Sequence, residues 1–390
     1  MNDKRACVSV DRLAFKRALD RLWAICGGSL LSDGLVTVHV SGESITLVLH
    51  GTSRATVSVE CKTDDGAPYE VVTLVAALRA AIKERSADRL FLHAHVDTLC
   101  VSNSGGVLSI ITDVWTANAV PVLPLRGPAV AASPEHVAVA AAIDRALPFV
   151  CEDQTRGIGS VRLRGAGDRL ALYATDGYVL SVEHVHAPEL AAAIGDKGRS
   201  LPLGLIQALR KGQKKSPLRV GVHGDILVAA CGGTLARGEG VGTYPPVDTF
   251  VSEAQNVRGL DAELRWSETE VVDACTWLAE LPQESTVTMQ VAGKDGTPVA
   301  VRLQSTTNVL VLGDAQAVFV SEHKSARGRT AFNTWRDFST HYLLTCLCVF
   351  TGAAVRLVVT PDSLGPFYLT DVPESVHDRI VLTMPKKRGE

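Results

Sequence analysis

Two pairs of histidines are the residues of this sequence best suited to hold a metal ion. His93 and His95 form one pair, His184 and His186 form the other, and one residue separates the two imidazoles of each pair. On a strand this spacing puts both rings on one face, where they could ligate a metal. No third ligand is evident at a useful spacing. We therefore favour partly exposed strand histidines and predict neither a metal site nor a cofactor.

The cysteines are a second set of reactive side chains. They are Cys7, Cys26, Cys61, Cys100, Cys151, Cys231, Cys275, Cys346 and Cys348. Their number is odd, they are scattered, and no C-x-x-C pair occurs, which indicates reduced thiols in a cytoplasmic protein. The Cys346-x-Cys348 pair falls in an apolar helical segment, where cysteine commonly acts as a small hydrophobic residue.

Two further features suggest catalysis only at first sight. Gly238 to Gly242 is glycine-rich, but no helix that could cradle a phosphate follows it, and the chain has no G-x-x-x-x-G-K-[ST] motif. Asp176 follows a strand and precedes Gly177, so we interpret it as a turn residue. The sequence therefore predicts a protein that is not an enzyme.

Composition places the chain among ordinary globular proteins. It has 390 residues, 46% of them hydrophobic, with 39 Lys and Arg against 42 Asp and Glu, a net charge of −3. A protein that binds DNA through its bulk charge is usually basic, so any positive field here must be local. The first ten residues are polar, unlike a signal peptide, and no apolar run approaches the length of a membrane span.

One unit recurs three times along the chain. Leu74 to Arg79 matches Leu205 to Arg210, and a third copy occupies Leu343 to Leu347; the first leucine recurs 131 and then 138 residues later. Apolar residues in each copy follow helical spacing, and alternating runs broken by turn residues follow the copies as predicted strands.

Each copy is also preceded by an amphipathic helix and strands. The predicted helices are Leu13 to Ile25, Val137 to Val150 and Glu268 to Leu281, and the strands are Leu35–Val40, Ile45–Leu49, Val161–Arg164, Leu170–Tyr173, Val287–Val291 and Val299–Leu303. Proline-rich junctions separate the copies. We therefore predict an α+β fold of three tandem two-helix, β-rich domains over residues 1–126 (N-terminal), 127–250 (central) and 251–390 (C-terminal).

Four short motifs, in order, point to a known family. Leu172 to Leu180 resembles the ATDGHRLA signature, and Gly242 to Pro245 resembles G-x-[FY]-P. Ala331 to Asn333 followed by Tyr342 to Leu344 resembles an FN…YLL helix, and Val381 to Pro385 resembles a C-terminal VxMP. Together with the threefold repeat, they make the chain similar to the bacterial DNA sliding clamp, the β subunit of the DNA polymerase III holoenzyme, as a divergent member.

The resemblance implies a DNA clamp fold with two helices of each domain on an inner wall. It implies a head-to-tail homodimeric ring around duplex DNA that acts as a processivity factor in DNA replication. The implied partners are double-stranded DNA of any sequence, the replicative DNA polymerase, a clamp loader, other proteins with clamp-binding peptides and a second copy of the chain. No binding to a membrane is implied. The alternative is a clamp-like paralogue with an accessory DNA-binding role or a metal-dependent hydrolase role.

The resemblance also assigns three groups of residues. The expected DNA-binding residues are Arg12, Lys16, Arg17, Arg21, Arg79, Lys83, Arg210, Lys211, Lys214 and Lys215. The expected partner-peptide pocket, between the second and third domains, is formed by Ile158, Thr175, Gly177, Tyr178, Val179, Leu180, Pro245, Thr249, Pro366, Leu382, Met384 and Pro385. The expected dimer contacts are Leu108 and Ile110 on an edge strand and Trp277 and Leu278 on a helix. Val179 stands where the family signature has Arg.

Overall fold

The computed structural model describes most of the chain. The described residues are 7–26, 34–50, 54–64, 69–83, 88–94, 98–103, 106–111, 115–116, 134–153, 156–211, 216–223, 226–232, 234–237, 243–255, 262–294, 300–306, 309–312, 316–318, 331–359, 367–371 and 378–385. They gather into two compact units. The first unit contains residues 1–140 and 199–240, and the second contains residues 141–198 and 241–390.

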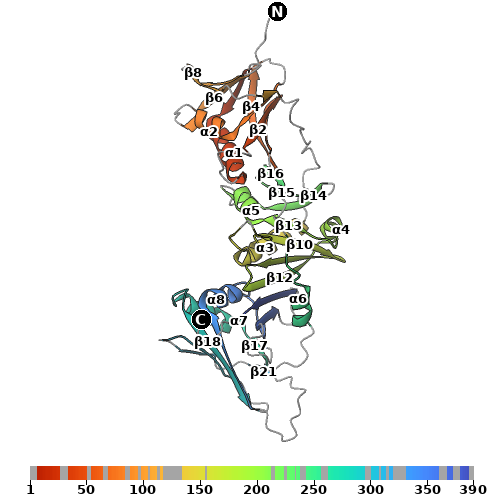
Figure 1. The fold of residues 1–390 in the computed structure, drawn as a ribbon, viewed down its shortest axis with the longest axis vertical. Helices are drawn as coiled ribbons and strands as arrows, with labels where there is room; N and C mark the ends of the chain where they lie inside the picture. The colour runs from red at the N-terminus through yellow and green to blue at the C-terminus, as the bar shows by residue number, and fades with distance from the viewer. Residues whose placement is uncertain are drawn as a thin grey trace, which may run out of the picture. The chain divides into compact units, whose positions relative to one another are not determined.

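The first unit is built on an antiparallel sheet (Figure 1). Its strands are β1 (Cys7–Asp11), β2 (Leu35–Ser41), β3 (Ser44–His50), β4 (Arg54–Asp64), β5 (Tyr69–Leu74), β6 (Arg89–Ala94), β7 (Leu99–Asn103), β8 (Gly106–Ile111), β9 (Trp115–Thr116), β14 (Arg219–His223), β15 (Ile226–Cys231) and β16 (Thr234–Arg237). They run in the order β8-β7-β6-β1-β4-β3-β2-β5-β9, and β16 joins β15 and β14 to this sheet by pairing with β4.

Alternation of side chains explains why these segments form half-buried strands. In β4, Val57 and Val59 are buried while Ser58 and Glu60 are exposed, which is the period of two that one buried sheet face requires. The helices α1 (Arg12–Ile25), α2 (Val75–Lys83) and α5 (Leu203–Arg210) belong to the same unit, and α1 packs against both of the others. The short strand β13 (Arg199–Pro202) leads into α5.

Helix α1 begins at a side-chain cap. The Asp11 carboxylate accepts a hydrogen bond from the backbone N–H of Ala14 at 2.7 Å, which satisfies one of the free donors at the helix start. Phe15, Leu19 and Leu22 follow at helical spacing and are fully buried. One face of α1 therefore belongs to the core, and its basic residues must lie on the other faces.

The second unit contains two antiparallel sheets. The larger consists of β10 (Ser160–Ala166), β11 (Arg169–Thr175), β12 (Val179–His186), β25 (Asp378–Thr383), β24 (Phe367–Asp371), β23 (Val355–Val359), β17 (Ala262–Trp266) and β21 (Gln316–Val318), in that spatial order. The smaller runs β20 (Val309–Leu312), β19 (Ala300–Gln304), β18 (Thr286–Lys294), β22 (Ala331–Ser339).

Helices of the second unit cover these sheets (Figure 1). They are α4 (Pro188–Ile194), α6 (Asp248–Gln255), α7 (Glu268–Ala279) and α8 (Thr340–Cys348), with a 3-10 turn, η2 (Leu147–Phe149). Helix α3 (Pro134–Ala146) spans the division between the units. Ser267 and Glu270 form a reciprocal capping box that fixes the start of α7, and α7 packs against α8 over a core that includes Leu278 and Leu343.

The predicted α+β fold is confirmed, because the predicted helices and strands are present close to their expected bounds. The predicted three-domain division stays a prediction. In the structure, residues 199–240 group with residues 1–140, since β16 continues the sheet of the first unit through β4. Sequence patterns show where strands begin and end, but they do not show which strand pairs across a predicted boundary.

Candidate functional site

The second unit contains a pocket of about 410 Å³. Its lining residues come from four segments of the chain, within residues 156–158, 175–180, 243–250 and 382–384. They are Arg156, Gly157, Ile158, Thr175, Gly177, Tyr178, Val179, Leu180, Thr243, Pro245, Val247, Phe250, Leu382 and Met384. A volume of this size accommodates a few side chains of a partner rather than a whole folded element.

The turn between β11 and β12 shapes one wall of the pocket. The Asp176 carboxylate accepts hydrogen bonds from the backbone N–H groups of Tyr178 at 2.8 Å and Val179 at 3.0 Å. The Thr175 hydroxyl donates to the Val179 carbonyl at 2.5 Å and accepts from the Gly177 N–H at 3.0 Å. Gly177 has a φ of 101°, in the region that disfavours side chains. Asp176 is therefore a turn residue, as expected, and the turn presents the Tyr178 ring outward.

A second wall depends on a close approach between two loops. A Cβ atom on Gly157 would lie 2.4 Å from the carbonyl oxygen of Thr243, which is too short for any side chain to fit there. Glycine at this position lets the backbone beside Ile158 meet the backbone that leads to Pro245 and Val247. The G-x-[FY]-P resemblance thus falls on a loop that the pocket requires.

The floor of the pocket is apolar and the rim is aromatic. Leu180 and Leu382 lie opposite each other in the pairing of β12 with β25, and each is 5% exposed. By contrast, Tyr178, Phe250 and Met384 are exposed to 62%, 41% and 37%. Large apolar side chains exposed around an apolar floor are typical of a surface that a partner covers. The site is therefore suited to bind the apolar side chains of a peptide.

An aromatic stack extends the rim toward α8. The Tyr178 and Tyr342 rings lie with centroids 5.7 Å apart at an angle of 22°, and the His341 ring is tilted against Tyr342. Burial, followed by the charge and the hydrogen bond of Asp176, raises the pKa of Tyr342 to about 12, so its phenol is neutral at physiological pH. The exposed guanidinium of Arg156 supplies a cation beside this surface.

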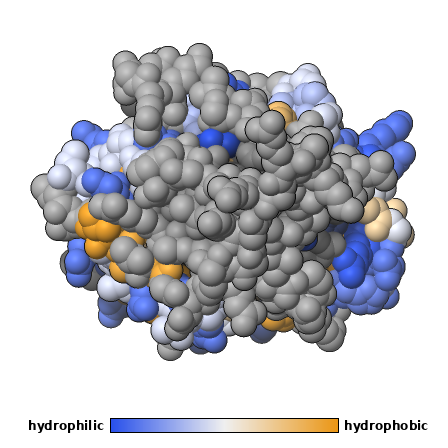
Figure 2. All heavy atoms as spheres, turned by 90° about the horizontal axis from the view of Figure 1, so that it is seen from below, coloured by the Kyte–Doolittle hydropathy of each residue, from blue (hydrophilic) through white to orange (hydrophobic). Residues whose placement is uncertain are grey.

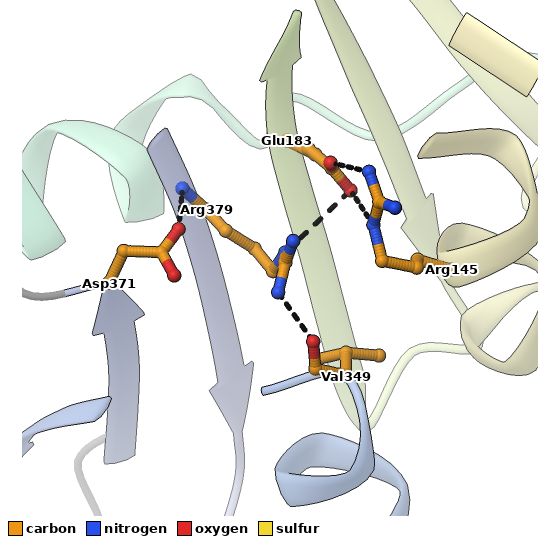
Figure 3. Close-up of polar contacts among 5 residues, drawn as sticks. All are labelled: Arg145, Glu183, Val349, Asp371 and Arg379. Atoms are coloured by element: carbon orange, nitrogen blue, oxygen red, sulfur yellow. Dashed lines mark hydrogen bonds and ion pairs between the residues drawn. The ribbon is translucent and has the colours of Figure 1, made fainter. Parts of the chain in front are cut away.

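Charged residues fill the face of the sheet behind the pocket (Figure 3). Glu183 on β12 is 3% exposed and Arg379 on β25 is 6% exposed, and the two are paired in register. Arg145 of α3 makes two hydrogen bonds to the Glu183 carboxylate, and Arg379 donates to the carbonyl of Val349. The Arg379 guanidinium also lies over the Phe350 ring at 5.3 Å. This network fixes β12 against β25.

Nine of the residues predicted for the peptide pocket line it. They are Ile158, Thr175, Gly177, Tyr178, Val179, Leu180, Pro245, Leu382 and Met384. Thr249 and Pro385 are neighbours of lining residues, and Pro366 lies outside the described residues. Val179 is 2% exposed, so the valine that replaces the signature arginine belongs to the pocket floor.

Sequence reasoning missed five lining residues. These are Arg156, Gly157, Thr243, Val247 and Phe250. Thr243 belongs to the Gly242 to Pro245 motif, which is a usable signal in the sequence. The others lie in loops or at the start of α6, and no local pattern marks them as close to β12 and β25.

Two of the basic residues that are expected to bind DNA are paired with an acidic side chain. Asp20 of α1 receives hydrogen bonds from Lys16 at 2.8 Å and from Arg79 of α2 at 3.0 Å. Burial raises the pKa of Asp20, but the hydrogen bonds and charges of Lys16 and Arg79 outweigh it and hold that pKa below its usual value. The Arg79 guanidinium also lies 4.8 Å from the Trp23 ring. This cluster of two cations and one anion carries a net charge of +1.

The other candidates differ in how they are placed. Arg17 and Lys211 are exposed, whereas Arg12 and Arg210 are half-buried. Arg21 donates hydrogen bonds to the Gly232 carbonyl at 3.1 Å and to the Thr234 hydroxyl at 3.0 Å, so it joins α1 to β16. The side chain of Lys83, and Lys214 and Lys215 entirely, lie outside the described residues.

The residues predicted at the dimer interface require one correction. Leu278 is fully buried in its own unit, so it belongs to the core beneath α7 and cannot form part of an exposed apolar surface. Trp277 is half-buried beside it, and Val272 on the same helix is 40% exposed. The side chains of Leu108 and Ile110 lie outside the described residues. Among the residues that Figure 2 colours, the hydrophobic areas are small and lie beside hydrophilic ones.

The histidine pairs have other neighbours. The His93 ring is within hydrogen-bond distance of the Cys7 thiol and the Ser102 hydroxyl, and His186 pairs with Asp168 at 3.2 Å. His95 lies outside the described residues. Within the part of the chain that the structure describes, no three His, Cys, Asp or Glu residues cluster as metal ligands would. Among the same residues, no helix combines the length and apolar character needed to cross a membrane.

Comparison with solved structures places the whole chain in one fold. The DNA polymerase sliding clamp from Bacillus subtilis is 12% identical, with a TM-score of 0.71 over 98% of this chain and 100% of that chain. The DNA polymerase III subunit beta from Pseudomonas aeruginosa is 18% identical, with a TM-score of 0.69 over 98% and 99% of the two chains. The beta clamp from Helicobacter pylori bound to a DNA ligase peptide is 12% identical, with a TM-score of 0.69 over 98% and 100%.

These likenesses define the class of fold. The chain has the DNA clamp fold of the polymerase III beta subunits, at an identity that marks it as divergent. No family model and no curated protein sequence matches it. Likeness at this level establishes the fold, so the activity has to be argued from the site.

Proposed function

We propose that this chain is a DNA sliding clamp, a non-catalytic processivity factor for a replicative DNA polymerase. Two copies join head to tail into a ring around duplex DNA, and the ring slides because its contacts with phosphates carry no sequence information. Partners are tethered through short peptides that insert into the pocket beside β12 and β25. The clamp loader and other proteins with such peptides use the same site.

The pocket is the observation that carries the proposal. It combines an apolar floor with exposed aromatic and methionine side chains at its rim, a combination that binds apolar peptide side chains of more than one partner. The pocket also lies where the sequence resemblance predicts a partner site. One of the solved structures of the same fold is described as bound to a DNA ligase peptide, which supports a peptide as the ligand.

The ring and its DNA contacts rest on further support. A heterologous contact between two copies closes into a ring when its rotation allows, and a threefold repeat in each copy gives six similar parts around the duplex. Exposed Arg17 and Lys211 and the net positive cluster around Asp20 provide a local positive field in a chain whose net charge is −3. We place the protein in the cytoplasm, because its nine cysteines are odd in number and scattered along the sequence, with no C-x-x-C pair.

The decisive experiment compares nicked circular DNA with the same DNA after linearisation. The protein is assembled on the circle with a clamp loader from a bacterial replication system, and its retention is followed through a gel-filtration column. A topologically linked ring stays on the circle and leaves the linear molecule from its ends. Equal retention on both forms would show ordinary DNA binding and would refute the clamp proposal.

A further inference from the structure

Two cysteines that are distant in the sequence meet where α7 and α8 pack together. The Sγ atoms of Cys275 and Cys348 are 4.0 Å apart, although 73 residues separate them along the chain. Cys275 lies within α7, and Cys348 is the last residue of α8. Neither thiol belongs to the pocket or to the ion pairs behind it.

The two cysteines of α8 have different surroundings. Cys346 is fully buried, whereas Cys348 is exposed. Residues two apart on an α-helix point in directions about 200° apart, so one thiol belongs to the core and the other faces out beside α7. Cys275 is half-buried, so a small reagent reaches Cys348 first. The accessible thiol therefore has a second thiol directly behind it.

The separation is suitable for a covalent link. A disulfide bond holds its sulfur atoms at about 2.05 Å, so each sulfur has to move by about 1 Å from its present position. Rotation about the Cα–Cβ bonds of the two cysteines can move the sulfur atoms by this amount, because each sulfur lies at the end of a short side chain. The packing of α7 on α8 therefore already holds the pair close to bonding distance.

We propose that Cys275 and Cys348 form a redox-active dithiol, which a low-molecular-weight disulfide oxidises to a reversible disulfide bond between α7 and α8. The Cys348 thiolate attacks one sulfur of the small disulfide, forms a mixed disulfide and releases a small thiolate. The Cys275 thiol then loses its proton and attacks the Cys348 sulfur, which releases the second small thiol. The protein dithiol loses two electrons, and the small disulfide is reduced to two thiols.

The ionisation of the two thiols agrees with these roles. The hydrogen bond with Cys275 lowers the pKa of Cys348 to about 7, while burial opposes the shift. The same hydrogen bond, followed by burial and by the charge of Cys348, raises the pKa of Cys275. The thiolate is the nucleophile, so the exposed Cys348 initiates the exchange and Cys275 resolves it.

The test oxidises the folded, full-length protein with oxidised glutathione and maps the products. Non-reduced proteolytic digests are analysed by mass spectrometry across a series of ratios of reduced to oxidised glutathione. We expect a cross-linked pair of peptides that contains Cys275 and Cys348, formed under conditions in which the other seven cysteines stay reduced. We also expect the oxidised protein to melt several degrees higher, since the bond closes a long loop, and dithiothreitol to reverse the shift.

Matched variants distinguish the two roles. In Cys275→Ser, glutathione is expected to remain attached to Cys348, because no resolving thiol is present. In Cys348→Ser, Cys275 is expected to stay reduced, and Cys151→Ser, which removes a half-buried thiol elsewhere, is expected to behave like the parent. Glutathione that persists on Cys348 of the parent protein, or a different cysteine pair that forms first, would overturn the proposal. The disulfide map of the oxidised parent protein tests the proposal even if a variant folds poorly.

Discussion

Glu183 and Arg379 face each other across the pairing of β12 with β25, with the Glu183 Oε2 atom 3.7 Å from the Arg379 Nε atom. Both are almost fully buried, and Arg145 adds a second cation to the same carboxylate (Figure 3). Three residues along each strand, Leu180 and Leu382 form a second pair, and this odd spacing places them on the opposite face of the sheet, where they form the floor of the pocket. The network therefore determines the register on which the pocket depends.

The first prediction concerns this buried carboxylate. Glu183→Gln is expected to lower the free energy of unfolding by about 3 kcal/mol, because it leaves two guanidinium groups without their buried counter-charge. Asp248→Asn is the control, since it breaks the ion pair of two largely exposed side chains with Arg164 and is expected to cost below about 1 kcal/mol. Urea unfolding measures both. Equal effects of the two substitutions would contradict a structural role for the buried network.

The second prediction concerns the rim of the pocket. Tyr178→Ala and Met384→Ala are each expected to weaken the binding of a peptide with a Leu or Phe anchor by about tenfold or more, since burial of such a side chain is worth roughly 1.5–3 kcal/mol. Both side chains are exposed, so stability should change little. Val309→Ala, an exposed valine on β20, serves as the control. Fluorescence anisotropy of a labelled peptide provides the measurement, and unchanged affinity would remove the rim from the site.

A truncation is a poorer test of the same pocket. Leu382 and Thr383 pair with Leu180 and Val179 on one side of β25 and with β24 on the other. Deletion from Leu382 onward would therefore disturb the sheet as well as the pocket. A truncation that starts after Pro385 leaves these pairs intact and removes only Lys386 to Glu390, three of which are basic.

The third prediction concerns assembly. Trp277→Glu on α7 is expected to convert a dimer into a monomer, because a charge placed in an apolar contact between copies costs desolvation energy without a partner. Val137→Glu places the same charge at an exposed position on α3 and should leave assembly unchanged. Light scattering at micromolar concentration distinguishes the two. A parent protein that is itself monomeric would contradict the ring.

The fourth prediction concerns charge at the proposed DNA surface. Arg17→Glu combined with Lys211→Glu is expected to reduce retention on circular DNA, most strongly at low salt, because fewer counterions are released. Asp20→Asn should act in the opposite direction, since it releases Lys16 and Arg79 from their acidic partner. Retention measured at several salt concentrations tests both the expected decrease and the expected increase. If neither substitution has an effect, these helices do not face DNA.

The fifth prediction follows from the pKa of Cys348. The thiolate is the reactive form, and a pKa lowered to about 7 means that alkylation by iodoacetamide should reach half its maximal rate near pH 7 and level off above it. In Cys275→Ala the hydrogen bond is removed, so the midpoint is expected to rise toward that of an ordinary thiol. Mass spectrometry of the Cys348 peptide measures the rate. Identical profiles in both proteins would show that Cys275 does not stabilise the thiolate.

The threefold repeat was readable because each copy combines helical and strand periodicity with turn residues in the same order. The Thr175 to Tyr178 turn was readable too, since its hydrogen bonds are local and depend on residue types adjacent in sequence. Contacts between segments that lie far apart in the sequence could not be predicted. Gly157 meets Thr243 across many intervening residues, and no sequence pattern marks that approach.

The sequence also did not reveal which of two adjacent apolar residues in a helix is buried. Trp277 and Leu278 are adjacent apolar residues, and only the packing of α7 decides that Leu278 faces the core. Cys275 and Cys348 illustrate the same limit, because their proximity is a consequence of how α7 and α8 cross. The predicted fold was therefore secure, whereas individual side chains at surfaces required the structure.

The position of β25 has a consequence for how the protein is made. This strand inserts between β12 and β24, and its partner on β12 is synthesised roughly 200 residues earlier. While the ribosome translates the intervening segment, β12 presents an open edge, and such edges invite pairing with other chains. Closing a loop of this length is slow, so we expect the large sheet to complete late during biosynthesis. Until β25 is made, the edge of β12 stays open to pairing with other chains.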